Sequence, residues 1–144
     1  WDKLHVLVNN RYKIQSVSAI DKLTNLYNQA IQMDQILLEN RKDNLILRVK
    51  LNDLKDDIDC FRSHSGYFSE YHASSLMELS KIINKKYQTL SYYGFTKEKL
   101  TNVIRKIEPS GIDRIVPIGR TMDFSLVWDG YELINTLSRR VEII

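Results

Sequence analysis

The fold that we predict depends on one stretch, Gly111-Ile112-Asp113-Arg114-Ile115-Val116-Pro117-Ile118-Gly119, which continues through residues 120–130. A short apolar run ends in a glycine and is followed by an aromatic, acidic and glycine turn, Trp128-Asp129-Gly130. Three of the five glycines and one of the two prolines lie in this part of the chain. We expect a strand that ends at Gly119 and forms one edge of a ligand-binding crevice.

The second half of the chain alternates between patterns typical of strands and of helices. The expected strands cover residues 67–71, 87–93 and 114–118. Between them, a capping box at Ser75 and Glu78 begins one helix, and Thr96 caps the next. This alternation predicts a parallel sheet with right-handed crossovers, whose ligands lie beyond the carboxyl ends of the strands. Gly94 and Gly119 mark two such ends.

The first half predicts one helix and one hairpin. A helix is expected from Ser18, with Asp21 at its third position, and its apolar face turned inward. That face consists of Ile20, Leu23, Tyr27, Ala30 and Ile31. Residues 36–38 and 45–51 predict a hairpin, because a polar turn separates them and the second run alternates apolar with other residues. The predicted class is therefore α/β, with an open, mostly parallel sheet and a β-hairpin near residues 36–51.

The end of the chain predicts one more helix and a strand. The helix follows Gly130, has Leu133, Ile134 and Leu137 on its inner side, and carries arginines in its last turn, where they suit the helix dipole. Residues 141–144 are apolar enough to form a strand.

The length of the chain, 144 residues, predicts a single domain over residues 1–144. The chain begins at Trp1 rather than at methionine, so we expect a piece of a longer protein. Neither a bilayer-spanning run nor a signal peptide is visible in the sequence. A single cysteine, Cys60, excludes an internal disulfide and a multi-cysteine zinc site, and we expect a cytoplasmic protein.

The charge of the chain is small and uneven. Its formal net charge is +3; residues 1–72 carry ten basic and ten acidic side chains, and residues 73–144 carry eleven and eight. A nucleic-acid-binding protein would show a clustered basic face, so we do not expect a nucleic-acid partner. The excess is compatible with an anionic small ligand, although a solvated surface is the more frequent explanation.

No complete catalytic centre is visible in the sequence. Cys60 follows Asp56, Asp57 and Asp59, which disfavour a reactive thiolate, so we assign no catalytic residue. The three histidines lack the spacing of metal ligands. The acidic loop at residues 53–59 lacks the glycine and the final glutamate of a calcium loop, so we assign no metal site. Phosphate-binding, dinucleotide-binding and serine-elbow motifs are also absent.

Four residues are candidates for substrate binding: Gly119, Arg120, Trp128 and Asp129. Arg120 follows the end of a predicted strand and could hold a phosphate or carboxylate, or it could pair with Asp123. Trp128 and Asp129 could bind a ligand, or they could fill the core and cap the last helix. Both alternatives stay open.

These residues together resemble the carboxyl-terminal signature of LuxC-like acyl-CoA reductases, in the aldehyde-dehydrogenase-like superfamily. The stretches that carry the resemblance are residues 111–119, 123–125 and 128–133, supported by residues 66–71 and 87–94. The resemblance covers residues 60–144 well and residues 1–59 loosely. The Trp128-Asp129-Gly130 version is similar to that of non-luminous bacterial relatives.

The resemblance implies a function for the whole parent protein. Members of the family use NADPH to reduce long-chain fatty acyl groups from acyl-CoA to aldehydes, through a cysteine thioester. The chain would then be the C-terminal portion of such an enzyme and inactive alone, because the nucleophilic cysteine and the nucleotide-binding domain lie upstream. It would supply the far wall of the acyl pocket and form a homo-oligomer. The alternative is a non-enzymatic α/β binding or oligomerisation module.

Overall fold

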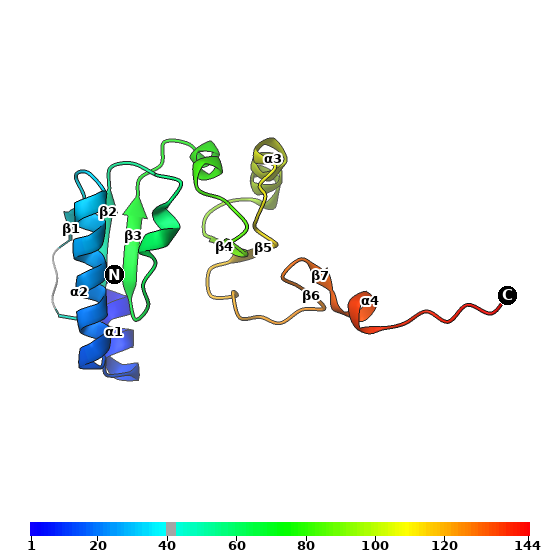
Figure 1. The fold of residues 1–144 in the computed structure, drawn as a ribbon, viewed down its shortest axis with the longest axis horizontal. Helices are drawn as coiled ribbons and strands as arrows, with labels where there is room; N and C mark the ends of the chain where they lie inside the picture. Colours follow the sequence, from blue (N-terminus) through cyan, green and yellow to red (C-terminus); the bar gives the residue numbers. More distant parts are fainter. Residues whose placement is uncertain (40–42) are drawn as a thin grey trace. The chain divides into compact units, whose positions relative to one another are not determined.

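The computed structural model of the chain describes residues 1–39 and 43–144. It divides into two compact units, Trp1–Ile82 and Ile83–Ile144, and each contains helices and strands (Figure 1). The predicted α/β class is confirmed, because both units combine helices with strands. Compactness does not show whether the units unfold together, so the single domain stays a prediction.

The first unit is built on a three-stranded sheet of order β1-β2-β3. Strand β1 (Leu37–Leu38) pairs antiparallel with β2 (Leu47–Leu51), which pairs in parallel with β3 (Tyr67–Tyr71). The predicted pairing of the hairpin is confirmed, although residues 40–42 of its turn lie outside the described residues. The strand predicted at residues 67–71 is also confirmed.

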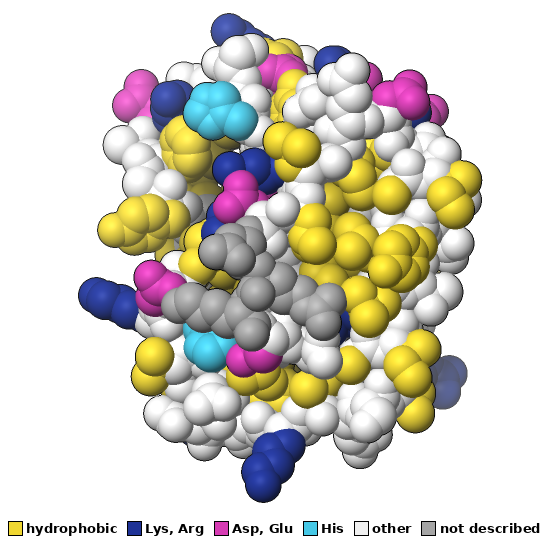
Figure 2. Space-filling view, turned by 90° about the vertical axis from the view of Figure 1, so that its left-hand side faces the viewer, with side chains coloured by type: hydrophobic (Ala, Val, Ile, Leu, Met, Phe, Trp, Pro, Cys, Tyr) yellow, Lys and Arg dark blue, Asp and Glu magenta, His cyan; other side chains and the backbone are white. Residues whose placement is uncertain are grey.

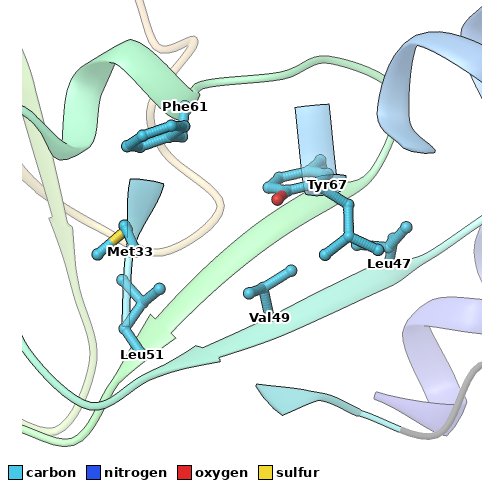
Figure 3. Close-up of a cluster of buried hydrophobic side chains, with 7 residues drawn as sticks. Met33, Leu47, Val49, Leu51, Phe61 and Tyr67 are labelled. Atoms are coloured by element: carbon cyan, nitrogen blue, oxygen red, sulfur yellow. The ribbon is translucent and has the colours of Figure 1, made fainter. Parts of the chain in front are cut away.

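The core of this unit lies on one face of the sheet. The buried alternating side chains are Leu45, Leu47, Val49 and Leu51, as the period-two pattern predicts. Leu47, Val49 and Leu51 pack in one cluster with Leu26, Met33, Phe61 and Tyr67 (Figure 3). Burial raises the pKa of the Tyr67 hydroxyl to about 12.

Helix α2 (Ser16–Gln32) turns a different face to this core from the one predicted. Its buried residues are Ala19, Lys22, Leu26 and Gln29. Leu23 packs against the core, but Ile20, Tyr27, Ala30 and Ile31 are exposed, so the predicted face is wrong. The helix also begins two residues before the predicted cap Ser18, after Gln15, and no side chain caps it.

Two buried polar side chains explain this rotation of α2. The Lys22 ammonium donates to the carbonyl oxygens of Leu45 (3.2 Å) and Ser65 (2.8 Å), and also to that of Asn44. Gln29 accepts a hydrogen bond from the Tyr67 hydroxyl. Buried polar groups are tolerated where they are hydrogen-bonded, so these partners fix which side of the helix faces the sheet.

Helix α1 (Asp2–Arg11) was not predicted, and its start packs on β2 and β3 through Trp1. The indole lies 4.9 Å from the Phe68 ring and 4.4 Å from the Arg48 guanidinium. Arg48 donates from two nitrogens to the two carboxylate oxygens of Glu70, at 2.5 and 2.7 Å, and this raises the pKa of Arg48. Glu70 therefore belongs to an ion pair.

The capping box predicted at Ser75 and Glu78 is confirmed, but it opens the short 3-10 helix η2 (Leu76–Lys81) rather than an α-helix. A second 3-10 helix, η1 (Ile58–Phe61), lies between β2 and β3. The Tyr71 and Ser74 hydroxyls and nearby backbone amides donate to Glu78 and lower its pKa to about 2.

This network predicts a pH-dependent contribution to stability. Because the folded-state pKa is depressed, the contribution of Glu78 is complete above its ordinary pKa of 4.5 and is lost as the pH falls to about 2. We expect Glu78→Gln to unfold at lower urea concentration than the unmodified chain at neutral pH. The difference should shrink in this acid range, and a constant difference would contradict the assignment.

The second unit contains a parallel pair of strands and a helix. Strand β4 (Thr89–Tyr92) pairs with β5 (Arg114–Pro117), and helix α3 (Lys97–Ile107) connects them. The cap at Thr96 is confirmed, since its hydroxyl accepts from the Lys99 amide at 3.2 Å. The apolar side of α3 is half-buried, and Leu100 is buried.

The single open sheet that was predicted is wrong, because β3 pairs with β2 in one sheet and β4 with β5 in another. Strand β3 lies in the first unit and β4 in the second, and the connection between them carries only the 3-10 helix η2. What remains of the prediction is two parallel pairs, with an antiparallel strand in the first sheet.

The end of the chain differs most from the prediction. Strands β6 (Val127–Trp128) and β7 (Tyr131–Glu132) form a small antiparallel hairpin, followed by the five-residue helix α4 (Leu133–Leu137). Ile134 and Leu137 are exposed, and residues 138–144 form neither the last helical turn nor the predicted strand. Within the described ranges, no helix combines the length and the apolar character that a bilayer crossing requires.

Candidate functional site

A cleft of about 780 Å³ lies in the second unit. Its wall is formed by the segments that lead into β4 and β5 and by the β6–β7 hairpin. The lining residues with polar or aromatic side chains are Lys85, Gln88, Ser110, Asp113, Trp128, Asp129, Tyr131 and Thr136. Leu133 adds an apolar surface, and Gly111 adds exposed backbone. The cleft therefore joins an aromatic and aliphatic wall to a few polar groups, as small-molecule sites commonly do.

The hairpin turn holds Trp128 and Tyr131 beside each other. Asp129 and Gly130 form its two-residue loop, and both have positive φ, 48° and 79°. This is the backbone of a type I′ turn, for which Asp-Gly is a preferred pair. The Asp-Gly dipeptide was therefore a hairpin signal that our sequence analysis did not use. Asp129 shapes a turn rather than capping α4, whose N-cap is Glu132, and no side-chain hydrogen bond caps this helix.

Arg114 fixes the loop between β5 and the hairpin. Its guanidinium lies 4.3 Å from the centre of the Trp128 ring. The same group donates to the carbonyl oxygens of Thr121 (3.2 Å) and Asp123 (2.8 Å). Trp128 also stacks on Phe124, with 5.5 Å between ring centres and 26° between planes. The loop is thereby folded back along β5, and Trp128 comes to lie near the beginning of that strand.

Gly111 lets the two segments that lead into β4 and β5 approach closely. An added Cβ would lie 2.1 Å from the Asn84 oxygen and 2.8 Å from the Tyr87 oxygen. Directly after it, the Ile112 amide donates to Tyr87 (2.6 Å) and the Asp113 amide donates to Gln88 (2.8 Å). Gly111, the first residue of the stretch on which the predicted fold depends, is thus needed for a backbone contact at the edge of the cleft.

The structure separates the four predicted binding residues. Trp128 and Asp129 line the 780 Å³ cleft, at the amino ends of β4 and β5. Arg120 instead lines a second cleft of about 400 Å³ along β5, and Gly119, at the carboxyl end of β5, lines neither. The expectation that one crevice lies beyond the carboxyl ends is therefore wrong for the larger cleft, because the loop after β5 folds back past the strand. Ligand binding by these residues stays a prediction.

Arg120 has the partner that the sequence suggested. Its Nε donates to the Asp123 carboxylate at 2.6 Å, and both side chains are exposed, 68% and 51%. An exposed pair of this kind adds little to stability. One carboxylate already neutralises Arg120, which weakens the case for an anion site at this position.

Nucleophilic and metal chemistry find little support in the described residues. Cys60 is exposed in η1 and lines neither of the two clefts described above. Among the residues that the structure describes, no three histidine, cysteine, aspartate or glutamate side chains are grouped to hold a metal ion. Nor does the larger cleft fit the pyrophosphate of NADPH, because Asp113 and Asp129 line it and no glycine-rich turn lies there.

No protein-family model, curated protein or solved structure matches this chain.

Proposed function

We propose that this chain is the C-terminal portion of an NADPH-dependent, LuxC-like long-chain fatty acyl-CoA reductase, and that it supplies one wall of the acyl pocket. One observation carries the proposal. Two parts of the sequence that resemble that family, residues 111–119 and 128–133, lie apart in the chain and line the same cleft. If the two parts bind one substrate, they are expected to line the same cleft.

The chemistry of the cleft favours the acyl chain over the CoA group. Trp128, Tyr131 and Leu133 offer apolar surface for methylene groups. Asp113 and Asp129 would repel the phosphates of CoA, and Lys85 offers one compensating charge. The NADPH site and the thioester-forming cysteine belong, in this proposal, to other parts of the parent protein, with an aldehyde-dehydrogenase-like fold, in a cytoplasmic homo-oligomer.

The proposal predicts where activity resides. The parent protein should oxidise NADPH in the presence of a long-chain acyl-CoA, and the 144-residue chain alone should not. Cys60→Ser should leave the activity of the parent unchanged. Turnover by the isolated chain, or loss of activity in Cys60→Ser, would show that Cys60 is the nucleophile. An inactive parent would favour a non-enzymatic binding module.

The role of the cleft is tested in the same assay. Trp128→Ala should lower kcat/KM for acyl-CoA by about 30-fold, equivalent to about 2 kcal/mol for an aromatic anchor that the bound ligand covers. Asp129→Asn retains a residue that tolerates the left-handed turn and should reveal the effect of the charge alone. Tyr93→Ala, at an aromatic residue that is 83% exposed and outside the cleft, is the control. Equal losses of activity and stability in Trp128→Ala would show a purely structural turn.

A further inference from the structure

Helix α2 exposes an apolar stripe on the side opposite the sheet. Val17, Ile20, Tyr27 and Ile31 are between 62% and 82% exposed, and Thr24 lies in the middle of the stripe. At about 100° per residue, these positions lie about half a turn away from the buried face of the helix. Figure 2 shows hydrophobic side chains gathered into a broad patch on the side of the molecule that includes α2.

The spacing of the stripe is that of a helix–helix seam. Its positions, 17, 20, 24, 27 and 31, are separated by three, four, three and four residues, which is the a/d pattern of a heptad repeat. A helix that only covers its own sheet needs one apolar face, and here that face is already used by Leu26 and its neighbours. The central position of the stripe is the polar Thr24.

We propose that α2 packs antiparallel against α2 of a second copy of this chain, through this seam. The direction follows from charge. Lys13 precedes the helix and Asp34 follows it, so an antiparallel pair brings opposite charges together at both ends. A parallel pair would instead place like charges side by side. The helix dipoles also favour the antiparallel arrangement.

The size of the seam indicates a weak dimer. The helix has 17 residues, so at about 1.5 Å per residue it is about 25 Å long. A face of this length and about 10 Å width is smaller than the roughly 800 Å² per partner of a stable complex. We therefore expect a concentration-dependent dimer in the micromolar range or weaker. The proposal deepens the homo-oligomer part of the proposed function and is independent of its acyl-CoA chemistry.

The first experiment measures mass against concentration by sedimentation. We expect the chain to rise from 17.0 kDa toward twice that mass, and Ile20→Glu to remain at one chain. Ile118→Glu is the matched control, because that isoleucine is 64% exposed, against 62% for Ile20, and lies outside α2. A chain that is monomeric at all concentrations, or a dimer that survives Ile20→Glu, overturns the proposal.

Direction and contact are tested by two further sets of variants. Lys13→Glu should weaken the dimer, and Lys13→Glu combined with Asp34→Lys should restore it; failure to restore overturns the antiparallel arrangement.

On a Cys60→Ser background, Thr24→Cys should form an interchain disulfide under copper-phenanthroline oxidation. Gln32→Cys, exposed on α2 but about 100° around the helix from the stripe, should not. Equal crosslinking of the two variants overturns the seam. Acyl-CoA reduction by the parent is assayed separately, so the proposed function can fail without this proposal.

Discussion

Lys22→Met should lower the free energy of unfolding of the first unit by about 3 kcal/mol, because backbone carbonyl oxygens at the buried beginning of the sheet lose their donor. Lys22 is 1% exposed, and its ammonium donates to Asn44, Leu45 and Ser65. Replacing a buried ion pair by apolar residues can be harmless when both partners change. Here at least three of the partners are backbone carbonyls, which no side-chain substitution removes.

The measurement can be made specific to the unit. The two tryptophans, Trp1 and Trp128, lie one in each unit, so fluorescence during urea unfolding in a Trp128→Phe background reports on the first unit. Lys55→Met is the matched control, because Lys55 donates to one exposed carbonyl at 3.4 Å and should cost within about 0.5 kcal/mol. The same measurement in a Trp1→Phe background reports on the second unit through Trp128. Unfolding of the two units at the same urea concentration would support the single-domain prediction.

Equal effects of the two lysine variants would overturn this account of α2. The helix would then turn its more apolar side, with Ile20 and Ile31, toward the sheet. In that case Ile31→Glu should be strongly destabilising. In the structure described, Ile31 is 82% exposed, and the same variant should be nearly neutral for folding.

Helix α2 also shows why the sequence predicted the elements of the fold better than their packing. The alternation of β2 and the caps at Ser75 and Thr96 depend on local spacing, and they were predicted correctly. The orientation of α2 depends on hydrogen bonds from Lys22 to residues 22 to 43 positions away. A hydrophobic pattern cannot reveal such bonds, because it counts lysine as a surface residue.

The candidate site was predicted in part for the same reason. Trp128 and Asp129 were selected because an aromatic residue beside an acidic turn is visible in the sequence, and both line the larger cleft. The position of the cleft at the amino ends of β4 and β5 was not predicted. The direction of the loop after β5 depends on Arg114 and on its hydrogen bonds to backbone oxygens of that loop. Lys85 and Gln88 were missed because they become neighbours of the hairpin only through that path.

Gly111→Ala should be the most damaging small substitution in the second unit, with an expected loss of about 3 kcal/mol from overpacking. The added methyl group would lie 2.1 Å from the Asn84 oxygen, and backbone cannot yield as a flexible side chain can. To make room, the segment before β5 must move away from the segment before β4. That movement would weaken the amide bonds from Ile112 and Asp113, which are 2.6 and 2.8 Å long.

Gly94→Ala separates this steric effect from the general cost of replacing glycine. Gly94 has a φ of 75° and open space around its Cα, so alanine there should cost only the backbone strain, about 1 kcal/mol. Gly111 is not among the residues with positive φ, so its larger loss would come from the close approach alone. Unfolding is followed by Trp128 fluorescence in a Trp1→Phe background. If Gly111→Ala costs no more than Gly94→Ala, the two segments do not meet as described. The cleft would then lose the wall that Gly111 shares with Gln88, and with it the convergence that supports an acyl pocket.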